Sequence, residues 1–425
     1  MTVTAIAFLL LIVLGAPIVF ALGVSAALTL YITDVPMSIV SQRLYAGLDS
    51  FTIMAIPFFV FAGIIMERGG IAQRIIDFAL ALVGSIKGSL LLVATVAGTG
   101  MAAISGSGSA DTAATASIML PEMRRRGYDI DFSACVMAAA GTLGPVIPPS
   151  IMMVVLATIS NLSVGRMFVA GIVPGLLLAA GIMLAAYLHA QRGGAAYAKT
   201  YDFSAGRLGK TFVAALPAFA MPLIIVGGIT GGVFTPTEAA AVAVLAGLVI
   251  SIRVYKAIVF ADLPQMILRA ASISAAVMII IATASVFSWL IASQGIPAAL
   301  GDWIHGVTEN KWAFLLLVNL LLIAVGMFME SISAILILVP VLMPIAIGYG
   351  VDPLHFGVVV IVNLAIGMIT PPYGITLVVA SNVAGRGILQ VSAKIGLPIL
   401  FMMVVLILAT YVPGIVTFLP GLLFD

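Results

Sequence analysis

The sequence predicts an all-α integral membrane protein made of two related halves, and three observations lead to this prediction. First, 63% of the 425 residues are hydrophobic and only 8% are charged, with a mean hydropathy of +1.28. A soluble domain carries about 25% charged residues because its surface faces water, so lipid must surround most of this chain. Second, apolar runs long enough to cross a bilayer recur from end to end. Third, the two halves share a rare spacing of proline and glycine.

The same composition excludes several classes of protein. The net charge is +2 and the longest basic run is 124–126, which makes nucleic acid a poor partner. The single cysteine, Cys135, excludes an internal disulfide and a cysteine-based metal cluster. No nucleophile–base pair or metal-ligand spacing stands out among the histidines and carboxylates, so we do not expect an enzyme.

Apolar runs of about 20 residues are candidate membrane-spanning segments. They lie near 4–31, 51–66, 88–104, 132–160, 167–188, 212–252, 270–293, 312–329, 355–383 and 395–419. Two further apolar stretches, 105–122 and 330–349, lie between full spans beside short turns, and we expect them to be re-entrant helical hairpins. The stretches 34–49 and 253–268 are expected at the membrane interface. The chain then divides into a first repeat over 1–190, a connector over 191–211 and a second repeat over 212–425.

Orientation is predicted from basic residues, which are enriched on the cytoplasmic side of membrane proteins. The run 124–126 and the connector can both be cytoplasmic; the basic residues of the connector are Arg192, Lys199, Arg207 and Lys210. The segment 212–252 leaves two possibilities open. A single crossing makes the halves inverted but puts Arg253 and Lys256 outside. A double crossing puts these two residues inside and makes the halves parallel. We prefer inversion.

A shift of 223 residues superposes rare residues of the two halves. The matched pairs are Pro148-Pro149 with Pro371-Pro372, Pro121 with Pro344, Gly127 with Gly350, Asp129 with Asp352, Gly144 with Gly367 and, with a small gap, Gly70 with Gly295. Helix breakers can recur without meaning in a membrane chain that contains proline. Matched proline pairs nevertheless favour a structural repeat, because many transporters are built from inverted repeats.

Each half is predicted to hold a span broken by its proline pair, over 131–160 and 355–383. Proline removes a backbone donor and frees carbonyl groups of the preceding turn. Within a membrane, such irregular backbone survives only where it is buried in protein or lines a cavity. Helix N-termini carry partial positive charge and C-termini partial negative charge. One site can therefore hold an anionic solute and a cation together, which suits symport. A plain proline kink in a structural helix is the alternative.

The first hairpin carries Ser105, Ser107, Ser109 and Asp111 in a glycine-rich stretch. Glycine lets the backbone approach a ligand closely, and hydroxyl and carbonyl oxygens are the ligands that a hard cation uses. Helix packing through small residues and helix capping by Asp111 are the alternatives. In the second half, Glu330 is an ionisable residue within a long apolar region. Such a residue indicates function unless it caps a helix or lies at the interface.

Together these motifs resemble the DctM-like large membrane subunit of TRAP transporters (tripartite ATP-independent periplasmic transporters). The motifs are 105–112, 144–150, 234–239, 329–331 and 370–374, and the resemblance covers essentially the whole chain. It implies the fold of elevator-type ion transporters, in which a transport domain with both hairpins slides against a fixed scaffold. It also implies sodium-driven transport of organic acids, such as C4-dicarboxylates or sialic acid, across the bacterial inner membrane. The implied partners are a small four-helix membrane subunit and a soluble periplasmic binding protein.

The resemblance implies site residues by position. In the first half, the coupling ion Na⁺ would be held by Ser105, Ser107, Gly144 and Val146. In the second half, the ion ligands would be Glu330, Ser331, Gly367 and Thr370. The solute would lie between them, near Ser109, Asp111, Pro149, Ser150, Pro372 and Tyr373.

Two other functions remain open at this point. A stand-alone sodium/dicarboxylate symporter would have the same fold and need no binding protein. A channel would need a continuous polar pore, whereas the polar residues of this sequence cluster at two positions.

Overall fold

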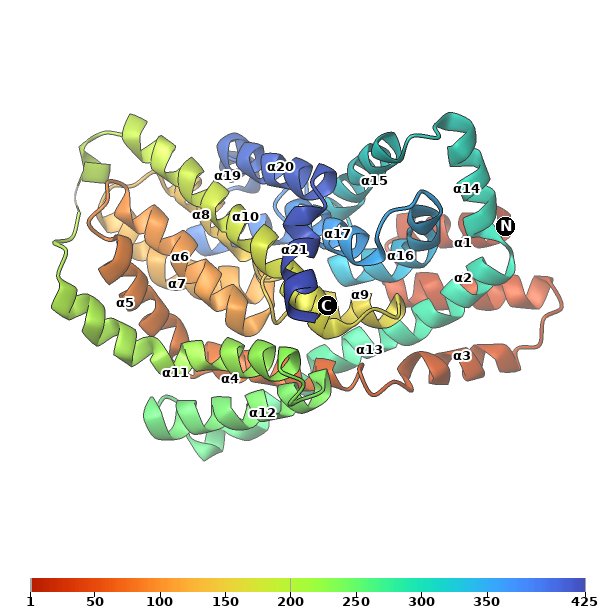
Figure 1. Ribbon diagram of the computed structural model, residues 1–425, viewed down its shortest axis with the longest axis horizontal. Helices are drawn as coiled ribbons and strands as arrows, with labels where there is room; N and C mark the ends of the chain where they lie inside the picture. The colour runs from red at the N-terminus through yellow and green to blue at the C-terminus, as the bar shows by residue number, and fades with distance from the viewer. Residues whose placement is uncertain (1, 199, 425) are drawn as a thin grey trace.

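The computed structural model describes residues 2–198 and 200–424, and over these residues it is helical with no β-strand (Figure 1). Among the described residues, five helices are long and apolar enough to cross a membrane, or up to eight when each bent helix pair counts as one span. The prediction of an all-α fold is therefore confirmed.

The helices follow one another along the chain without long loops. The first half contains α1 (Thr2–Val13), α2 (Ile18–Ile32), α3 (Ser38–Leu48), α4 (Ala55–Arg68), α5 (Ile71–Val83), α6 (Ser89–Ser105), α7 (Gly108–Arg125), α8 (Ile130–Gly141), α9 (Ile151–Ile159) and α10 (Val164–Arg192). The connector holds a short 3₁₀ turn, η1 (Ala195–Ala198).

The second half begins with a long helix that leaves the connector. Its elements are α11 (Ala205–Thr230), α12 (Pro236–Val249), the π-helical turn η2 (Ile250–Val254), the 3₁₀ turn η3 (Phe260–Asp262), α13 (Leu263–Ser293), α14 (Ile296–Val307), α15 (Lys311–Gly326), α16 (Ser331–Gly348), α17 (Pro353–Gly367), α18 (Ile375–Ala384), α19 (Ile388–Ser392), α20 (Gly396–Tyr411) and α21 (Gly414–Phe424). The broken spans predicted over 131–160 and 355–383 correspond to α8–α9 and α17–α18.

The two hairpins are larger than the sequence predicts. The stretch 105–122 is not a complete hairpin, because most of it belongs to the single helix α7, and the run 88–104, expected to be a span, is the other arm, α6. In the same way, 312–329 supplies the first arm, α15, and 330–349 supplies the second, α16. A hairpin arm within the membrane is as apolar as a full span, so hydropathy does not separate the two.

Two long apolar runs also divide. The run 4–31 forms α1 and α2, which pack antiparallel, since Thr4 Oγ1 lies 2.8 Å from Thr29 Oγ1. The run 212–252 lies in two helices, α11 and α12, so the single crossing is wrong. A capping box between Thr235 and Glu238 begins α12. The segment 253–268 is not one interfacial helix, because it holds the end of η2, all of η3 and the start of α13.

The two hairpins have their turns near the middle of the molecule and run from there to its opposite ends (Figure 1). Helix α20 connects these ends. Lys394, just before α20, pairs at 3.3 Å with Asp129, which follows the first hairpin. Tyr411, at the other end of α20, donates a 3.2 Å hydrogen bond to the carbonyl of Trp312, at the start of the second hairpin. The base of each hairpin therefore lies at a different end.

Matched positions of the two halves carry the same local structure. Gly70 and Gly295 have left-handed φ values of 73° and 67° and precede α5 and α14. Asp129 and Asp352 accept backbone hydrogen bonds at the starts of α8 and α17. The two diproline peptide bonds, Pro148-Pro149 and Pro371-Pro372, are both cis. Local structure thus repeats with the sequence spacing.

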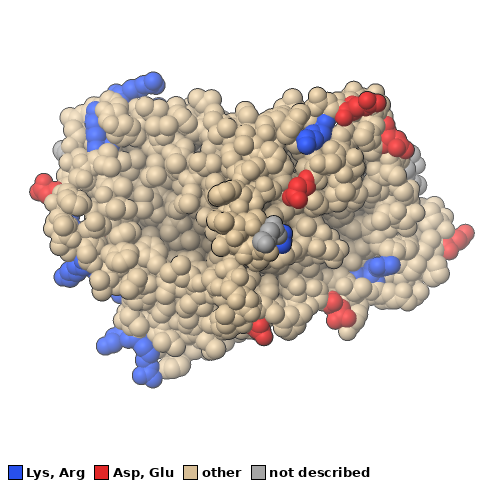
Figure 2. Space-filling model, viewed as in Figure 1, with Lys and Arg blue, Asp and Glu red and all other residues tan. Residues whose placement is uncertain are grey.

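Charge is distributed unevenly between the two ends. On the face shown in Figure 2, Lys and Arg predominate at the end where the connector lies, and Asp and Glu predominate at the other. Arg253 and Lys256 belong to the connector end, because the hydroxyl of Tyr255 donates a 2.9 Å hydrogen bond to the carbonyl of Ala214 in the first half of α11. Lys199, the other basic residue of interest there, lies outside the described residues. The double crossing therefore puts Arg253 and Lys256 at the connector end without making the hairpins parallel.

Candidate functional site

Both hairpin turns and both broken spans line one cavity of about 690 Å³, which we call the central cavity. The first turn contributes 106–109 and the second contributes 326–333, while the breaks contribute Pro145, Met368 and Tyr373. Apolar residues of α2, α4 and α13 form the opposite wall. The two breaks therefore meet at one space inside the protein.

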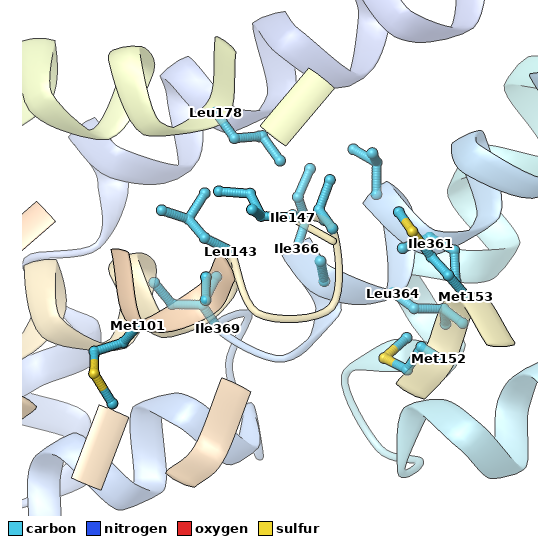
Figure 3. Close-up of a cluster of buried hydrophobic side chains, with 14 of the residues drawn as sticks. Met101, Leu143, Ile147, Met152, Met153, Leu178, Ile361, Leu364, Ile366 and Ile369 are labelled. Carbon is cyan, nitrogen blue, oxygen red and sulfur yellow. The ribbon is translucent and has the colours of Figure 1, made fainter. Parts of the chain in front are cut away.

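Buried apolar side chains hold the two breaks together (Figure 3). Leu143 and Ile147 of the first break belong to the same buried cluster as Ile366 and Ile369 of the second, and Leu178 of α10 lies beside them. Close packing of this kind has little free volume and resists displacement. The cluster therefore fixes the positions of both diproline turns.

The first hairpin turn is pressed against the first break through glycine. Gly106 has a φ of 63°, and a Cβ there would lie 2.4 Å from the Pro149 carbonyl oxygen. A Cβ on Gly144 would lie 2.9 Å from the amide nitrogen of Gly108 and 3.1 Å from Oδ2 of Asp111. A side chain at either glycine would therefore push the turn away from the break.

Asp111 is a buried carboxylate with an unfilled acceptor. Its Oδ1 accepts a 2.5 Å hydrogen bond from Ser105 Oγ, which itself accepts one from the Ser107 amide at 3.1 Å. Asp111 is 1% exposed, and among the described residues its Oδ2 has no hydrogen-bond partner. A buried carboxylate oxygen needs a hydrogen bond, a proton or a cation, because its lost hydration is costly. The Ser105–Asp111 pair therefore offers a place for positive charge.

Asp111 does not line the central cavity. Together with Ser105 and Ser107, it borders a separate cavity of about 70 Å³ whose other wall includes Glu67 and Arg269. These last two residues, from α4 and α13, form an ion pair at 3.2 Å. Val60, Ser107, Ile151 and Ile273 line both cavities, so the two cavities adjoin. Asp111 thus lies beside the central cavity without lining it.

The second hairpin turn is organised differently. Glu330 precedes α16 and caps it, since Oε2 accepts hydrogen bonds from the Ser333 amide at 2.9 Å and the Ser333 hydroxyl at 3.2 Å. Glu330 and the buried Ser331 both line the central cavity. A Cβ on Gly367 would lie 2.6 Å from the Cα of Gly326, so this turn also meets its break at glycine. Glu330 therefore combines helix capping with a place on the cavity wall.

The two breaks differ in exposure. Pro149 and Ser150 are buried and line neither cavity, and the Ser150 hydroxyl donates a 2.6 Å hydrogen bond to the Pro145 carbonyl. Pro372 and Tyr373 are exposed, Tyr373 by 68%. The diproline turn of the second break is therefore more exposed than that of the first, which reaches the central cavity through Pro145.

Two of the residues predicted as ion ligands face other groups. A Cβ built on Gly171 would lie 2.4 Å from the Val146 carbonyl oxygen, so this carbonyl faces α10. The Thr370 hydroxyl donates a 2.7 Å hydrogen bond to the Ile366 carbonyl. Neither Val146 nor Thr370 lines the two cavities described above. The predicted site residues that do line the central cavity are Ser107, Ser109, Glu330, Ser331 and Tyr373.

A buried polar network in the second half was missed in the sequence. The Asn363 side-chain amide donates to the Asn319 side-chain oxygen at 2.8 Å, and the Asn319 amide donates to the Thr410 hydroxyl at 3.0 Å. These residues join α15, α17 and α20, and all three are 5% exposed or less. Two asparagines within apolar runs were the available signal.

The chemistry of the central cavity suits an anion together with a cation. Helices α7 and α16 both begin at the cavity, and the partial positive charge of a helix N-terminus favours an anion. No group of three or more His, Cys, Asp or Glu side chains that could hold a metal is present within 2–198 and 200–424. Ser107, Ser109, Glu330, Ser331 and Tyr373 supply polar side-chain atoms to a lining that is otherwise mostly apolar.

Comparison with known proteins gives one consistent result. The family described as "Tripartite ATP-independent periplasmic transporter, DctM component" matches residues 5–415. The C4-dicarboxylate TRAP transporter large permease protein DctM of Rhodobacter capsulatus is 40% identical over 424 residues, covering 96% of each chain. The sialic acid TRAP transporter large permease protein SiaM of Vibrio cholerae is 37% identical over 370 residues, covering 87% of this chain and 86% of that one.

Two further relatives bear on the architecture. The isethionate TRAP transporter permease protein DctMQ of Oleidesulfovibrio alaskensis is 41% identical over 423 residues, which cover 97% of this chain and 65% of that protein. Among solved structures, the Alcanivorax borkumensis YdaH transporter matches with a TM-score of 0.54 at 15% identity, over 85% of this chain and 86% of that one. The match to the YdaH transporter shows a similarity of fold. The chain therefore belongs to the DctM family of large permease subunits of TRAP transporters, which are inner-membrane transport proteins and not enzymes.

Proposed function

We propose that this chain is the translocating subunit of a sodium-coupled symporter for small organic acids. The observation that carries the proposal is the central cavity, where both turns and both breaks meet. Relatives are named for C4-dicarboxylates, sialic acid and isethionate, which are all organic anions. We further propose that it acts with a small four-helix membrane subunit and a periplasmic binding protein, and the DctMQ relative supports the first of these partners.

The solute is proposed to bind in the central cavity between the two turns. The N-termini of α7 and α16 supply partial positive charge there, and the hydroxyls of Ser109 and Tyr373 can donate hydrogen bonds to a carboxylate. Pro372 is exposed next to Tyr373 and completes the accessible side. Pro149 and Ser150 support the first turn from behind.

The coupling ion is proposed to bind beside the first turn, with Asp111 as one of its ligands. Asp111 was first expected to contact the solute, but a carboxylate repels an anion, and this one is separated from the central cavity. Its unpartnered Oδ2, the hydroxyls of Ser105 and Ser107, and the backbone near Gly144 supply oxygen ligands. Glu330, Ser331 and Gly367 are the matching proposal in the second half.

An elevator motion between inverted repeats is the proposed mechanism. The central cavity lies between an apolar wall from α2, α4 and α13 and the polar turns of the two hairpins. Few polar groups would have to be separated if the hairpins and breaks slid along that wall. The opposite directions of the two hairpins support inversion of the halves (Figure 1).

A transport assay with the purified components tests this function. Proteoliposomes that hold the chain and its small subunit should take up an organic acid only with an inward sodium gradient and the cognate binding protein. Ser105→Ala and Ser107→Ala should weaken activation by sodium more than they lower the amount of folded protein. Wild-type sodium activation in both variants would show that the first hairpin does not bind the ion.

The same assay addresses the stand-alone symporter. Saturable, sodium-dependent uptake of the acid without any binding protein would replace the tripartite mechanism by a simple symporter of the same fold. Uptake that persists with no sodium gradient would instead argue against ion coupling.

A further inference from the structure

A second large cavity, of about 790 Å³, lies further along the same helices, and four serines and a threonine are among the residues that line it; we call it the serine-lined cavity. We propose that it is a solute approach site, in which Arg43 receives the carboxylate of an organic anion before the anion reaches the central cavity. This inference rests on the proposed function and adds a binding site to it.

The two cavities follow one another along α13. Residues 273, 276, 277 and 280 line the central cavity, and 281, 284, 285, 288 and 289 line the serine-lined cavity. Within each set, the spacing of three and four residues is that of one helical face. On α16, Ile332 and Ser333 line the first cavity and Leu336 and Val339 line the second. Helices α13 and α16 thus contribute to the walls of both cavities, and the serine-lined cavity lies further along each helix.

Arg43 supplies the positive charge of the serine-lined cavity. On α3, Arg43, Ala46 and Gly47 line it on one helical face, and Ser50, just after the end of the helix, lines it as well. A Cβ on Gly47 would lie 2.6 Å from the Cβ of Ser285, so α3 is packed tightly against α13 at this point. The glycine therefore brings the face that carries Arg43 up to the serines of α13.

Arg43 is free to receive an anion. Among the described residues no carboxylate forms an ion pair with it. Its guanidinium lies 5.3 Å from the centre of the Trp289 ring, which holds it at the cavity while leaving its N–H groups available. Arginine donors match the geometry of a carboxylate. Arg43 therefore offers a local site for an anion in this cavity.

Hydroxyl groups complete the site. Ser50, Ser285, Ser288, Thr158 and Ser160 all border the cavity, with Asn161 at its rim. The buried Ser160 Oγ has no hydrogen-bond partner among the described residues. Hydroxyls both donate and accept, so they suit the hydroxyl and carboxyl groups of small organic acids. A lipid headgroup has related anionic chemistry, but the helices α13 and α16 that this cavity shares with the central cavity favour the transported solute.

Reaction of one introduced cysteine with charged reagents tests the site without requiring transport. The natural Cys135 is fully buried, so Ser288→Cys supplies the reactive thiol in the serine-lined cavity. In lipid nanodiscs, a sulfonate-bearing methanethiosulfonate should react faster than a trimethylammonium-bearing one. Adding Arg43→Gln should slow the anionic reagent by about tenfold at low salt, and salt should shrink this difference. Lys311→Gln, a basic residue at the same end that does not line this cavity, should have little effect.

Three results would overturn the proposal. These are an unreactive Ser288→Cys, equal rates for the two reagents, or no effect of Arg43→Gln. Reaction in detergent but not in nanodiscs would assign the cavity to a lipid headgroup instead. Each of these results is independent of whether the chain transports anything.

Uptake of succinate tests whether the serine-lined cavity contributes to transport. Arg43→Gln should raise the half-saturating concentration of succinate-loaded binding protein by about tenfold, with unchanged activation by sodium, and Arg43→Lys should restore much of the loss. A wild-type chain that takes up no organic acid would contradict the proposed function. The relative rates of the two reagents at Ser288→Cys would still show whether the serine-lined cavity attracts anions. Unchanged succinate kinetics in Arg43→Gln would remove the approach site and leave the transport function intact.

Discussion

At the scale of single residues, the first hairpin is organised around one buried carboxyl group, that of Asp111. Ser105 donates a hydrogen bond to one of its oxygens, and the other oxygen, which lies near Gly144, has no hydrogen-bond partner among the described residues. A charge buried in this way is costly unless a cation or a proton accompanies it. The unpartnered oxygen of Asp111 is therefore the feature on which the proposed ion site of the first hairpin depends.

Replacing Asp111 by asparagine tests this role of the carboxylate. Asp111→Asn keeps the size and the hydrogen bond from Ser105 but removes the charge. We expect the sodium concentration for half-maximal uptake to rise by about tenfold or more, equivalent to at least about 1.4 kcal/mol of ion binding. The measurement is sodium-dependent uptake in proteoliposomes that carry equal amounts of folded protein.

The matched control makes the same chemical change at a helix cap. Asp352→Asn keeps a good capping residue at the start of α17, where the aspartate accepts the His355 amide at 2.8 Å. It should leave the sodium dependence unaltered. Equal sodium responses in the two variants would show that the charge of Asp111 has no part in ion binding.

The sequence located this region because its signals are local. Glycines, hydroxyls and prolines mark breaks in a helix wherever they occur, so Ser105, Ser107 and both diproline pairs could be identified from the sequence. The direction of the Val146 carbonyl could not, because it depends on the close approach of Gly171 on another helix. The separation of Asp111 from the central cavity likewise arises from tertiary packing.

At the scale of elements, the second hairpin is tied to its broken span by side-chain amides. Asn319 on α15 and Asn363 on α17 bond directly, and Thr410 on α20 extends the network. The first half has Val96 and Ala140 at the positions that match these asparagines. The second hairpin therefore depends on polar bonds where the first uses apolar packing and glycine contacts. Such a network holds α15, α17 and α20 together.

A double-mutant cycle measures the strength of that connection. Asn319→Ala and Asn363→Ala should each lower the thermal stability of the purified protein, and the double variant should lose less than the sum. We expect a coupling energy of about 0.6 to 1.7 kcal/mol, the range found for polar pairs between membrane helices. Thermal unfolding in detergent gives the values. Strict additivity would mean that the two amides do not hold the helices together.

At the scale of the whole molecule, the hairpins determine how many times the chain crosses the membrane, and therefore whether the two halves are inverted or parallel. Hydropathy alone counted α6 and α15 as full spans, and under that count a double crossing of 212–252 demanded parallel halves. In the structure each hairpin returns to the end from which it came. Without the hairpin arms in the number of crossings, Arg253 and Lys256 can lie at the same end of the molecule as the connector while the two hairpins point in opposite directions. Basic residues gather at the connector end (Figure 2).

This distribution predicts which end faces the cytoplasm. Because basic residues are enriched on the cytoplasmic side, we expect the connector end inside and the acidic end outside. Single cysteines at Ala205 and Val307, both exposed, report on the two ends. In spheroplasts, a membrane-impermeant maleimide should label Val307→Cys at once and Ala205→Cys only after permeabilisation, while the buried Cys135 stays silent. The opposite pattern would reverse the orientation, and the serine-lined cavity would then face the cytoplasm, where a binding protein in the periplasm could not deliver to it.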